Sequence, residues 1–115
     1  MLILMTSSIE QGASEATELE ALLARIAQGE KDALASLYER THSAVYGFAM
    51  SLSHCPADAE DVLQETYINV YSAAERYVPK GKPMAWIMTI AKNLARMRLR
   101  EVKKNYELPD EDWAG

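Results

Sequence analysis

Acidic and amide side chains recur at helical spacing in the middle of the chain, where they could bind a basic partner. The group consists of Asp58, Asp61, Gln64 and Glu65. On a helix, residues three or four positions apart lie on one face. Carboxylates on an open face are suited to pairing with a positively charged surface. The chemistry indicated is ionic recognition, because these acids lie on an open helix face and no Ser-His-Asp or Cys-His pattern accompanies them.

A plainer interpretation of the acidic group also has to be considered. Acids in the first turn of a helix complement the helix dipole, and this explains Asp58, Glu60 and Asp61. It does not explain Glu65, nearly two turns further on, or the apolar Ile68, which we expect on the same exposed face. From the residues alone, a partner-binding surface and a solvated face both stay open.

A second group of side chains is basic and could bind phosphate. Lys92, Arg96, Arg100 and Lys103 form a stripe along one flank of an expected helix, and Thr89 and Asn93 lie along the same side. The preceding loop adds Lys80, Gly81 and Lys82, between Tyr77 and Trp86. Basic residues mixed with aromatic ones suit single-stranded nucleic acid, because the cations follow the backbone while the rings stack on bases. A solvated basic flank is the plainer alternative, and Trp86 alone is more often a core residue.

The net charge of −5 argues superficially against nucleic-acid binding, but the charge is unevenly distributed. Residues 1–77 carry a net charge of −8, residues 78–104 carry +7, and residues 105–115 carry −4. One face could therefore attract phosphate while another attracts a basic protein.

The residue pattern indicates neither catalysis nor metal binding. His42, His54 and Cys55 lack the paired spacing of a structural zinc site, and no catalytic triad or Gly-rich phosphate loop is present. We expect no metal, no cofactor and no enzymatic activity. A single cysteine is typical of a reducing cytoplasm. The apolar start, MLILM, is too short for a signal peptide or a membrane span, so we expect a cytoplasmic protein.

Helical periodicity predicts an all-α fold, a compact bundle of about four helices with a basic loop before the last one. The helices are expected at residues 18–28, from Asp32 to about residue 54, from Asp58 to about Tyr77, and from Pro83 to about Lys104. Asp32 and Asp58 are suited to start their helices as N-caps. We expect a flexible leader at residues 1–16, one domain at 17–104, and an acidic linker or tail at 105–115.

The same periodicity predicts which side chains face the core. In the second helix these are Leu34, Leu37, Tyr38, Thr41, Val45, Phe48, Ala49 and Leu52. In the third they are Ala59, Val62, Leu63, Thr66, Tyr67, Val70, Tyr71 and Ala74. In the fourth they are Ile87, Ile90, Ala91, Leu94 and Met97.

Two motifs, in order and at a characteristic separation, resemble those of one protein family. DAEDVLQETY at residues 58–67 resembles the core-binding signature of extracytoplasmic-function (ECF) sigma factors, D-x-E-D-hydrophobic-x-Q-E-x-F/Y. MAWIMTIAKNLA at residues 84–95 is similar to that family's R-x-W-L-x-R-I-A-R-N-x-A. The chain thus resembles region 2 of the sigma-70 family over residues 17–104.

The resemblance implies a function in transcription initiation and two binding surfaces. Docking on the basic clamp coiled coil of the largest subunit of core RNA polymerase would use Asp58, Asp61, Gln64, Glu65 and Ile68. Recognition and melting of the promoter −10 element, through a base flipped out of its non-template strand, would use Tyr77, Lys80, Gly81, Lys82, Lys92, Asn93, Arg96 and Arg100. An anti-sigma factor is a further implied partner, and no membrane is implied.

The chain departs from the family pattern in two respects. Met84 and Thr89 stand where the family usually has Arg, so fewer phosphate contacts are expected there. We expect no second domain of the kind (region 4) that reads the −35 element in such proteins, because the chain stops where the acidic linker begins. We interpret the chain as either an excised domain, which we favour, or a truncated protein. A helical protein-interaction module without DNA binding is the main alternative. A helix-turn-helix reader of duplex DNA is disfavoured, since no two short helices are joined by a tight turn.

Overall fold

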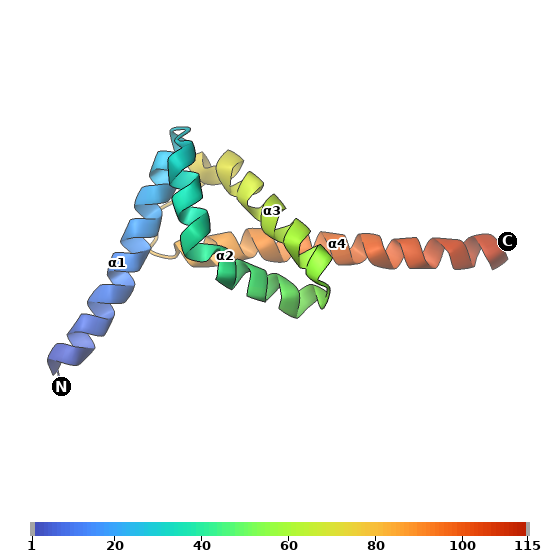
Figure 1. The fold of residues 1–115 in the computed structure, drawn as a ribbon, viewed down its shortest axis with the longest axis horizontal. Coiled ribbons are helices and arrows are strands. Elements are labelled where there is room, and N and C mark those ends of the chain that lie inside the picture. Colours follow the sequence, from blue (N-terminus) through green and yellow to red (C-terminus); the bar gives the residue numbers. More distant parts are fainter. Residues whose placement is uncertain (1, 115) are drawn as a thin grey trace.

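The computed structural model contains four α-helices and one short 3₁₀ helix (Figure 1). Their order is α1 (Leu2–Ala27), α2 (Lys31–Ser53), α3 (Pro56–Ala73), η1 (Ala74–Arg76) and α4 (Pro83–Ala114). The structure describes the backbone of residues 2–114 and the side chains of residues 15–104. Over residues 2–114 there is no β-strand, and the expected all-α bundle is confirmed. The expected leader and the expected tail fall almost entirely outside the residues whose side chains are described.

The turn between α1 and α2 ends the first helix as the sequence predicts. Gly29 has a φ of 89°, a left-handed conformation that costs a glycine nothing. Its N–H donates to the carbonyl of Ile26 at 2.8 Å, and the N–H of Glu30 donates to the carbonyl of Arg25 at 3.2 Å. This pair of bonds is a Schellman motif, and it turns the chain so that α2 runs back beside α1 (Figure 1).

The starts of α2 and α3 differ from the prediction. Asp32 and Asp58 lie inside the first turns, while the N-caps are Glu30 and Cys55, neither of which caps with its side chain. The Schellman turn ends at Glu30, so α2 begins directly after it, at Lys31. Pro56 begins α3, since its fixed φ suits the first helical position. Both acids still complement the helix dipole from the first turn.

The core lies where α2, α3 and α4 cross, with the end of α1 packed against them (Figure 1). Its most deeply buried large side chains are Leu23, Ile26, Leu37, Val45, Val62, Thr66, Val70 and Ile87. Thr41 donates its hydroxyl proton to the carbonyl of Leu37 at 2.7 Å, so the hydroxyl of Tyr67, 2.5 Å from Thr41 Oγ1, acts as the donor in that contact. This bond ties α3 to α2 inside the core.

Three residues expected in the core are exposed instead. Tyr38 covers the rim of the core, stacked on His42 and edge-on to Tyr67. Tyr71 lies one turn beyond Tyr67, on the outer side of α3, and is 40% exposed. Met97 is 56% exposed, because α4 runs on past α2 and α3 from about this point (Figure 1).

We predict that the inner side of α3 determines the stability of the domain. Leu63→Ala or Val70→Ala should lower the free energy of unfolding by about 1–4 kcal/mol, because each removes buried apolar volume and leaves a cavity. Ile68→Ala, on the exposed side of the same helix, should change it by less than about 0.5 kcal/mol. Denaturant unfolding of the three variants checks this. Equal stabilities would mean that the helix is packed in another register.

Candidate functional site

The expected polymerase-binding residues all lie on one side of α3, but they are not equally free. Gln64, Glu65 and Ile68 are exposed, and Ile68 has two thirds of its surface accessible. Asp58 and Asp61 are half-buried. We call these five residues the α3 face. Only its last three members present their side chains fully to a partner.

The two half-buried acids are held by Arg98 of α4. The guanidinium donates from Nε to Asp58 Oδ1 at 2.9 Å and from Nη2 to Asp61 Oδ2 at 2.7 Å. The hydrogen bond to Asp58 raises the pKa of Arg98, and the nearby charge of Asp61 raises it further. Arg98 therefore fastens the start of α3 to the middle of α4. Asp61, expected to be free, is an ion-pair partner within the chain.

We predict that Arg98 makes a modest and salt-sensitive contribution to stability. Arg98→Ala should lower the free energy of unfolding by about 1 kcal/mol at low salt, because the two ion pairs are partly exposed. The difference should shrink near 1 M salt, where surface charges are screened. Arg98→Lys keeps the charge but cannot bridge both acids in the same way, and should fall in between. Denaturant unfolding at both salt concentrations provides the measurement, and a salt-independent loss would instead indicate a packing role.

An apolar groove runs beside the α3 face, between α3 and the start of α2. It has a volume of about 570 Å³ and is lined by Lys31, Leu34, Gln64, Tyr67, Ile68 and Tyr71. Gln64 and Ile68 thus belong to both the face and the groove. Tyr71 was expected in the core, because its position matches the helical period of the core residues, but it lies on the surface.

The loop of residues 77–83 connects η1 to α4 and carries the expected base-capturing residues. Lys80, Gly81 and Lys82 are exposed, and Gly81 has a φ of 75°, which favours glycine at this position. The ring of Tyr77 is half-buried and meets Trp86 edge-on, with the ring centroids 5.1 Å apart. Trp86 is itself half-buried against the core. It is therefore neither a fully buried core residue nor a fully exposed ring for stacking on bases.

A carboxylate from α1 holds this loop. The hydroxyl of Tyr77 donates to Glu20 Oε2 at 2.5 Å, and the N–H of Gly81 donates to the same oxygen at 3.1 Å. These two bonds, the one from Tyr77 first, lower the pKa of Glu20. Burial and the bond to Glu20 raise the pKa of Tyr77. No sequence pattern points to Glu20, since it lies 57 residues before its partner Tyr77.

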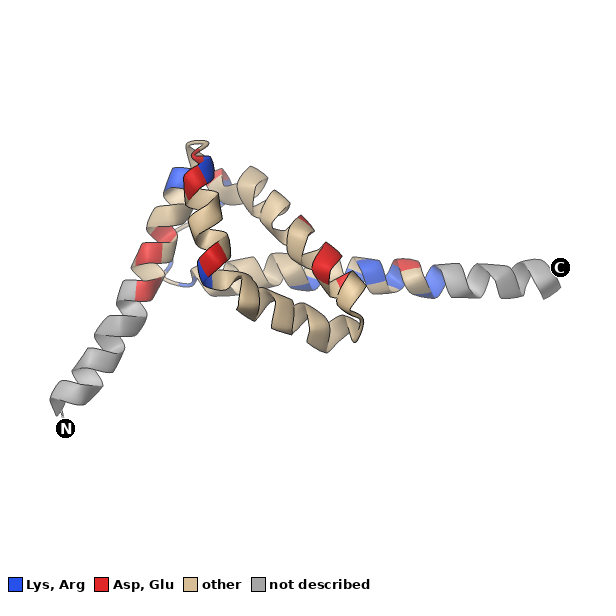
Figure 2. Cartoon of the chain, in the orientation of Figure 1, with Lys and Arg blue, Asp and Glu red and all other residues tan. Residues whose placement is uncertain are grey.

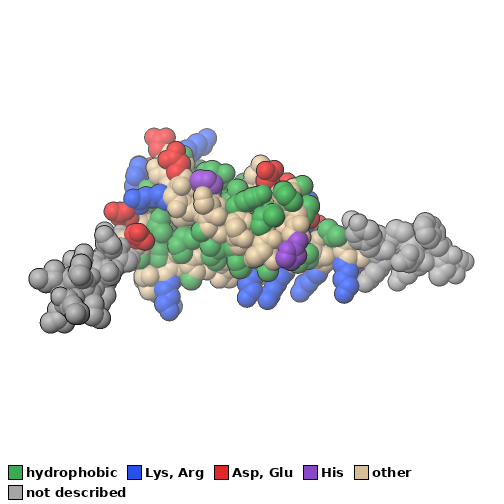
Figure 3. All heavy atoms as spheres, turned by 60° about the horizontal axis from the view of Figure 1, so that its bottom comes forward, with side chains coloured by type: hydrophobic (Ala, Val, Ile, Leu, Met, Phe, Trp, Pro, Cys, Tyr) green, Lys and Arg blue, Asp and Glu red, His purple; other side chains and the backbone are tan. Residues whose placement is uncertain are grey.

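The basic stripe of α4 is exposed along its whole described length. Lys92, Asn93, Arg96 and Arg100 all face solvent. Figure 3 shows basic side chains projecting in a row along the edge formed by α4, and Figure 2 shows acidic residues on α1 and α3. The uneven charge of the sequence is thus also separated in space.

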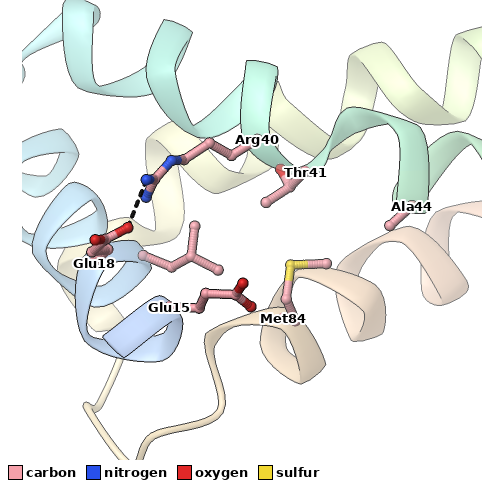
Figure 4. Close-up of a pocket in the computed structure, with 7 residues that line it drawn as sticks. Glu15, Glu18, Arg40, Thr41, Ala44 and Met84 are labelled. Atoms are coloured by element: carbon pink, nitrogen blue, oxygen red, sulfur yellow. Dashed lines mark ion pairs between the residues drawn. The ribbon is translucent and has the colours of Figure 1, made fainter. Parts of the chain in front are cut away.

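The two positions that depart from the family motif differ in their surroundings. Met84 lines a cleft of about 400 Å³ between α1, α2 and the start of α4, closed on one side by the ion pair of Glu18 with Arg40 (Figure 4). Thr89 is exposed, but its hydroxyl donates to the carbonyl of Ala85 at 2.8 Å. Neither residue adds a cation to the stripe.

The described residues contain neither a candidate metal-binding group nor a candidate membrane-spanning helix. Within this part of the chain, His, Cys, Asp and Glu form no group of three that could hold a metal ion. In the same part, every helix is too short or too polar to cross a membrane.

Comparison with known proteins identifies the family. The model of sigma-70 region 2 matches residues 37–105. The chain belongs to the sigma-70 region 2 family, and the resemblance seen in the sequence is confirmed.

Several similar proteins carry the name ECF RNA polymerase sigma factor SigK. The one from Mycobacterium sp. (strain KMS) is 41% identical over 85 residues, covering 73% of this chain and 44% of the relative. The one from Mycobacterium ulcerans is 39% identical over 84 residues, covering 72% and 45%. The one from Mycolicibacterium vanbaalenii is 33% identical over 102 residues, covering 84% and 52%. The chain therefore spans about half the length of these relatives.

Proposed function

We propose that this chain is a transcription-initiation module that docks on core RNA polymerase and binds the −10 element of a promoter. The observation that carries this proposal is the separation of charge within one family domain. An acidic and apolar surface lies on α3, and a basic stripe lies on α4 beside an exposed loop (Figures 2 and 3). Such a domain can hold a basic protein and a nucleic acid at the same time.

The α3 face is the polymerase-docking surface in this proposal. Gln64 and Glu65 would contact the basic clamp coiled coil directly, because both are exposed, and Ile68 supplies apolar area beside them. Asp58 and Asp61 have a different role. Through Arg98 they fix α3 against α4, so that the docked polymerase and the DNA-binding helix keep one relative orientation.

The loop and the stripe form the promoter-binding surface. Lys92, Arg96 and Arg100 would neutralise phosphates, and Asn93 would contact a base at the upstream edge of the −10 element. The 77–83 loop would hold a base flipped out of the non-template strand, with Lys80 and Lys82 beside the backbone. A flipped base costs unstacking energy, and the loop recovers it through its own contacts.

An anti-sigma factor is a further proposed partner, because ECF sigma factors are usually regulated by one.

The apolar groove beside the α3 face favours a second candidate function, a helical protein-interaction module that does not bind DNA. Both candidates would act where polymerase or its regulators are found, in the cytoplasm. The two candidate functions are distinguished by whether the chain binds nucleic acid.

Selection from a randomised single-stranded DNA library tests the proposed function. Core polymerase loaded with the chain should enrich a short common motif that core polymerase alone does not enrich. Core polymerase with the Glu65→Lys variant, which should not dock, is the matched control. Loading without any enriched motif would favour the protein-interaction module instead.

A further inference from the structure

We propose that Glu20 of α1 is a positioning residue that holds the 77–83 loop in the shape that selects a base. This inference rests on the proposed function, since it assigns a determinant to the same loop. Glu20 lies before the residues that match the family model, which begin at residue 37. Its role follows from the contacts it makes in this chain.

One carboxylate oxygen of Glu20 anchors the loop at two points. Tyr77, at the first position, donates its hydroxyl proton to Oε2, and Gly81, four residues on, donates its backbone N–H to the same atom. The ring of Tyr77 is then held edge-on against Trp86 of α4. The loop is thus fixed to two helices that belong to the core.

The side chains of the residues between these anchors are not packed against the core. Val78, Pro79 and Lys80 are exposed, and among the described side chains neither Lys80 nor Lys82 forms an ion pair. Without Glu20, the loop would sample many conformations and would have to be ordered when a base binds. A loop that is already ordered avoids this entropic loss.

The chemistry of Glu20 suits positioning better than direct DNA contact. An ionised carboxylate only accepts hydrogen bonds and would repel phosphates. Glu20 accepts hydrogen bonds from the Tyr77 hydroxyl and the Gly81 N–H. The side chains of Lys80 and Lys82 remain exposed and available to DNA. Removing it should therefore change which bases are preferred more than how strongly phosphates are bound.

Tryptophan fluorescence and base preference together test this role. The chain contains two tryptophans, so a Trp113→Phe background leaves Trp86 as the only one, next to Tyr77. Glu20→Ala removes both bonds, Glu20→Gln keeps the size and a neutral acceptor, and Tyr77→Phe removes the hydroxyl alone. Glu15→Ala is the matched control. It removes an acid from the same helix near Gly81 and Lys82, and Glu15 forms no hydrogen bond with the loop among the described residues.

We expect Glu20→Ala to make Trp86 more accessible to acrylamide and to lower the affinity for the enriched single-stranded motif roughly ten-fold, as expected for the removal of hydrogen bonds to a charged acceptor. Affinity for unrelated single strands and its salt slope should stay near those of Glu15→Ala. Glu20→Gln should be intermediate. Adding Tyr77→Phe to Glu20→Ala should cause little further loss, because both act through one contact.

The experiment distinguishes a failure of the proposed function from a failure of the role assigned to Glu20. If the parent chain shows no base preference, the proposed function is wrong, and base selection by the loop is wrong with it. If the parent shows a preference and Glu20→Ala retains it with native helical content, this inference is overturned while the proposed function stands. If Glu20→Ala does not fold, unchanged preference in Glu20→Gln and Tyr77→Phe overturns it equally.

Discussion

Reversing the charge of Glu65 should abolish binding to core RNA polymerase without unfolding the domain. Glu65 is exposed on the α3 face, so Glu65→Lys should change the free energy of unfolding by less than about 0.5 kcal/mol. Against a basic coiled coil it replaces an attraction with a repulsion worth several kcal/mol, a loss in affinity of about 100-fold or more. Fluorescence anisotropy with labelled chain and purified core polymerase measures the loss.

Glu75→Lys is the matched control, because it makes the same charge change at an exposed position in η1, beyond the end of α3. It should bind polymerase as the parent does. Asp61→Lys is a poorer test, since it would place a second cation beside Arg98 and destabilise the fold as well. Parental affinity in Glu65→Lys, with native helical content, would remove the α3 face from the docking surface.

Neutralising Lys92 and Arg96 together should weaken single-stranded DNA binding for all sequences alike. Each phosphate that the variant no longer neutralises should reduce the slope of log affinity against log salt by roughly 0.7, and the pair should therefore reduce it by about 1.4. The parent should prefer an unpaired strand to the matched duplex, because a base-capturing loop gains most when pairing is already broken. Anisotropy titrations at several low salt concentrations give both quantities.

The control for this variant is Lys31→Ala, which removes an exposed cation from the start of α2, away from the α4 stripe. Its salt slope should stay at the parental value. Tighter binding of the matched duplex than of the single strand would argue that the surface reads paired DNA, and the melting role would then be withdrawn.

Much of the fold follows from local pattern. The helices α2, α3 and the start of α4 lie close to their predicted positions, because apolar residues recur at the helical period and Gly29, Pro56 and Pro83 mark the boundaries. The exposed faces of α3 and α4 follow from the same period. The misplaced core residues, Tyr38, Tyr71 and Met97, match the period equally well. Whether another helix covers them is decided only by how the helices cross.

The family also follows from the sequence, because two motifs lie at the right separation and the family model matches residues 37–105. Motifs of this kind are contiguous, so they can be recognised without knowledge of the tertiary structure. They place the acids of α3 and the cations of α4 in separate groups. They contain no information on which of these charges satisfy one another inside the molecule.

Tertiary structure alone decides the two contacts that define the surfaces. Arg98 meets Asp58 across 40 residues of sequence, and Glu20 meets Tyr77 across 57. No periodicity connects such positions, because the pairing depends on the crossing of α3 over α4 and on the end of α1 lying beside η1. The sequence determined the helices, their charged faces and the family. Packing decided that Asp58 and Asp61 pair within the chain, that Gln64 and Glu65 stay exposed, and that a carboxylate from α1 holds the loop before α4.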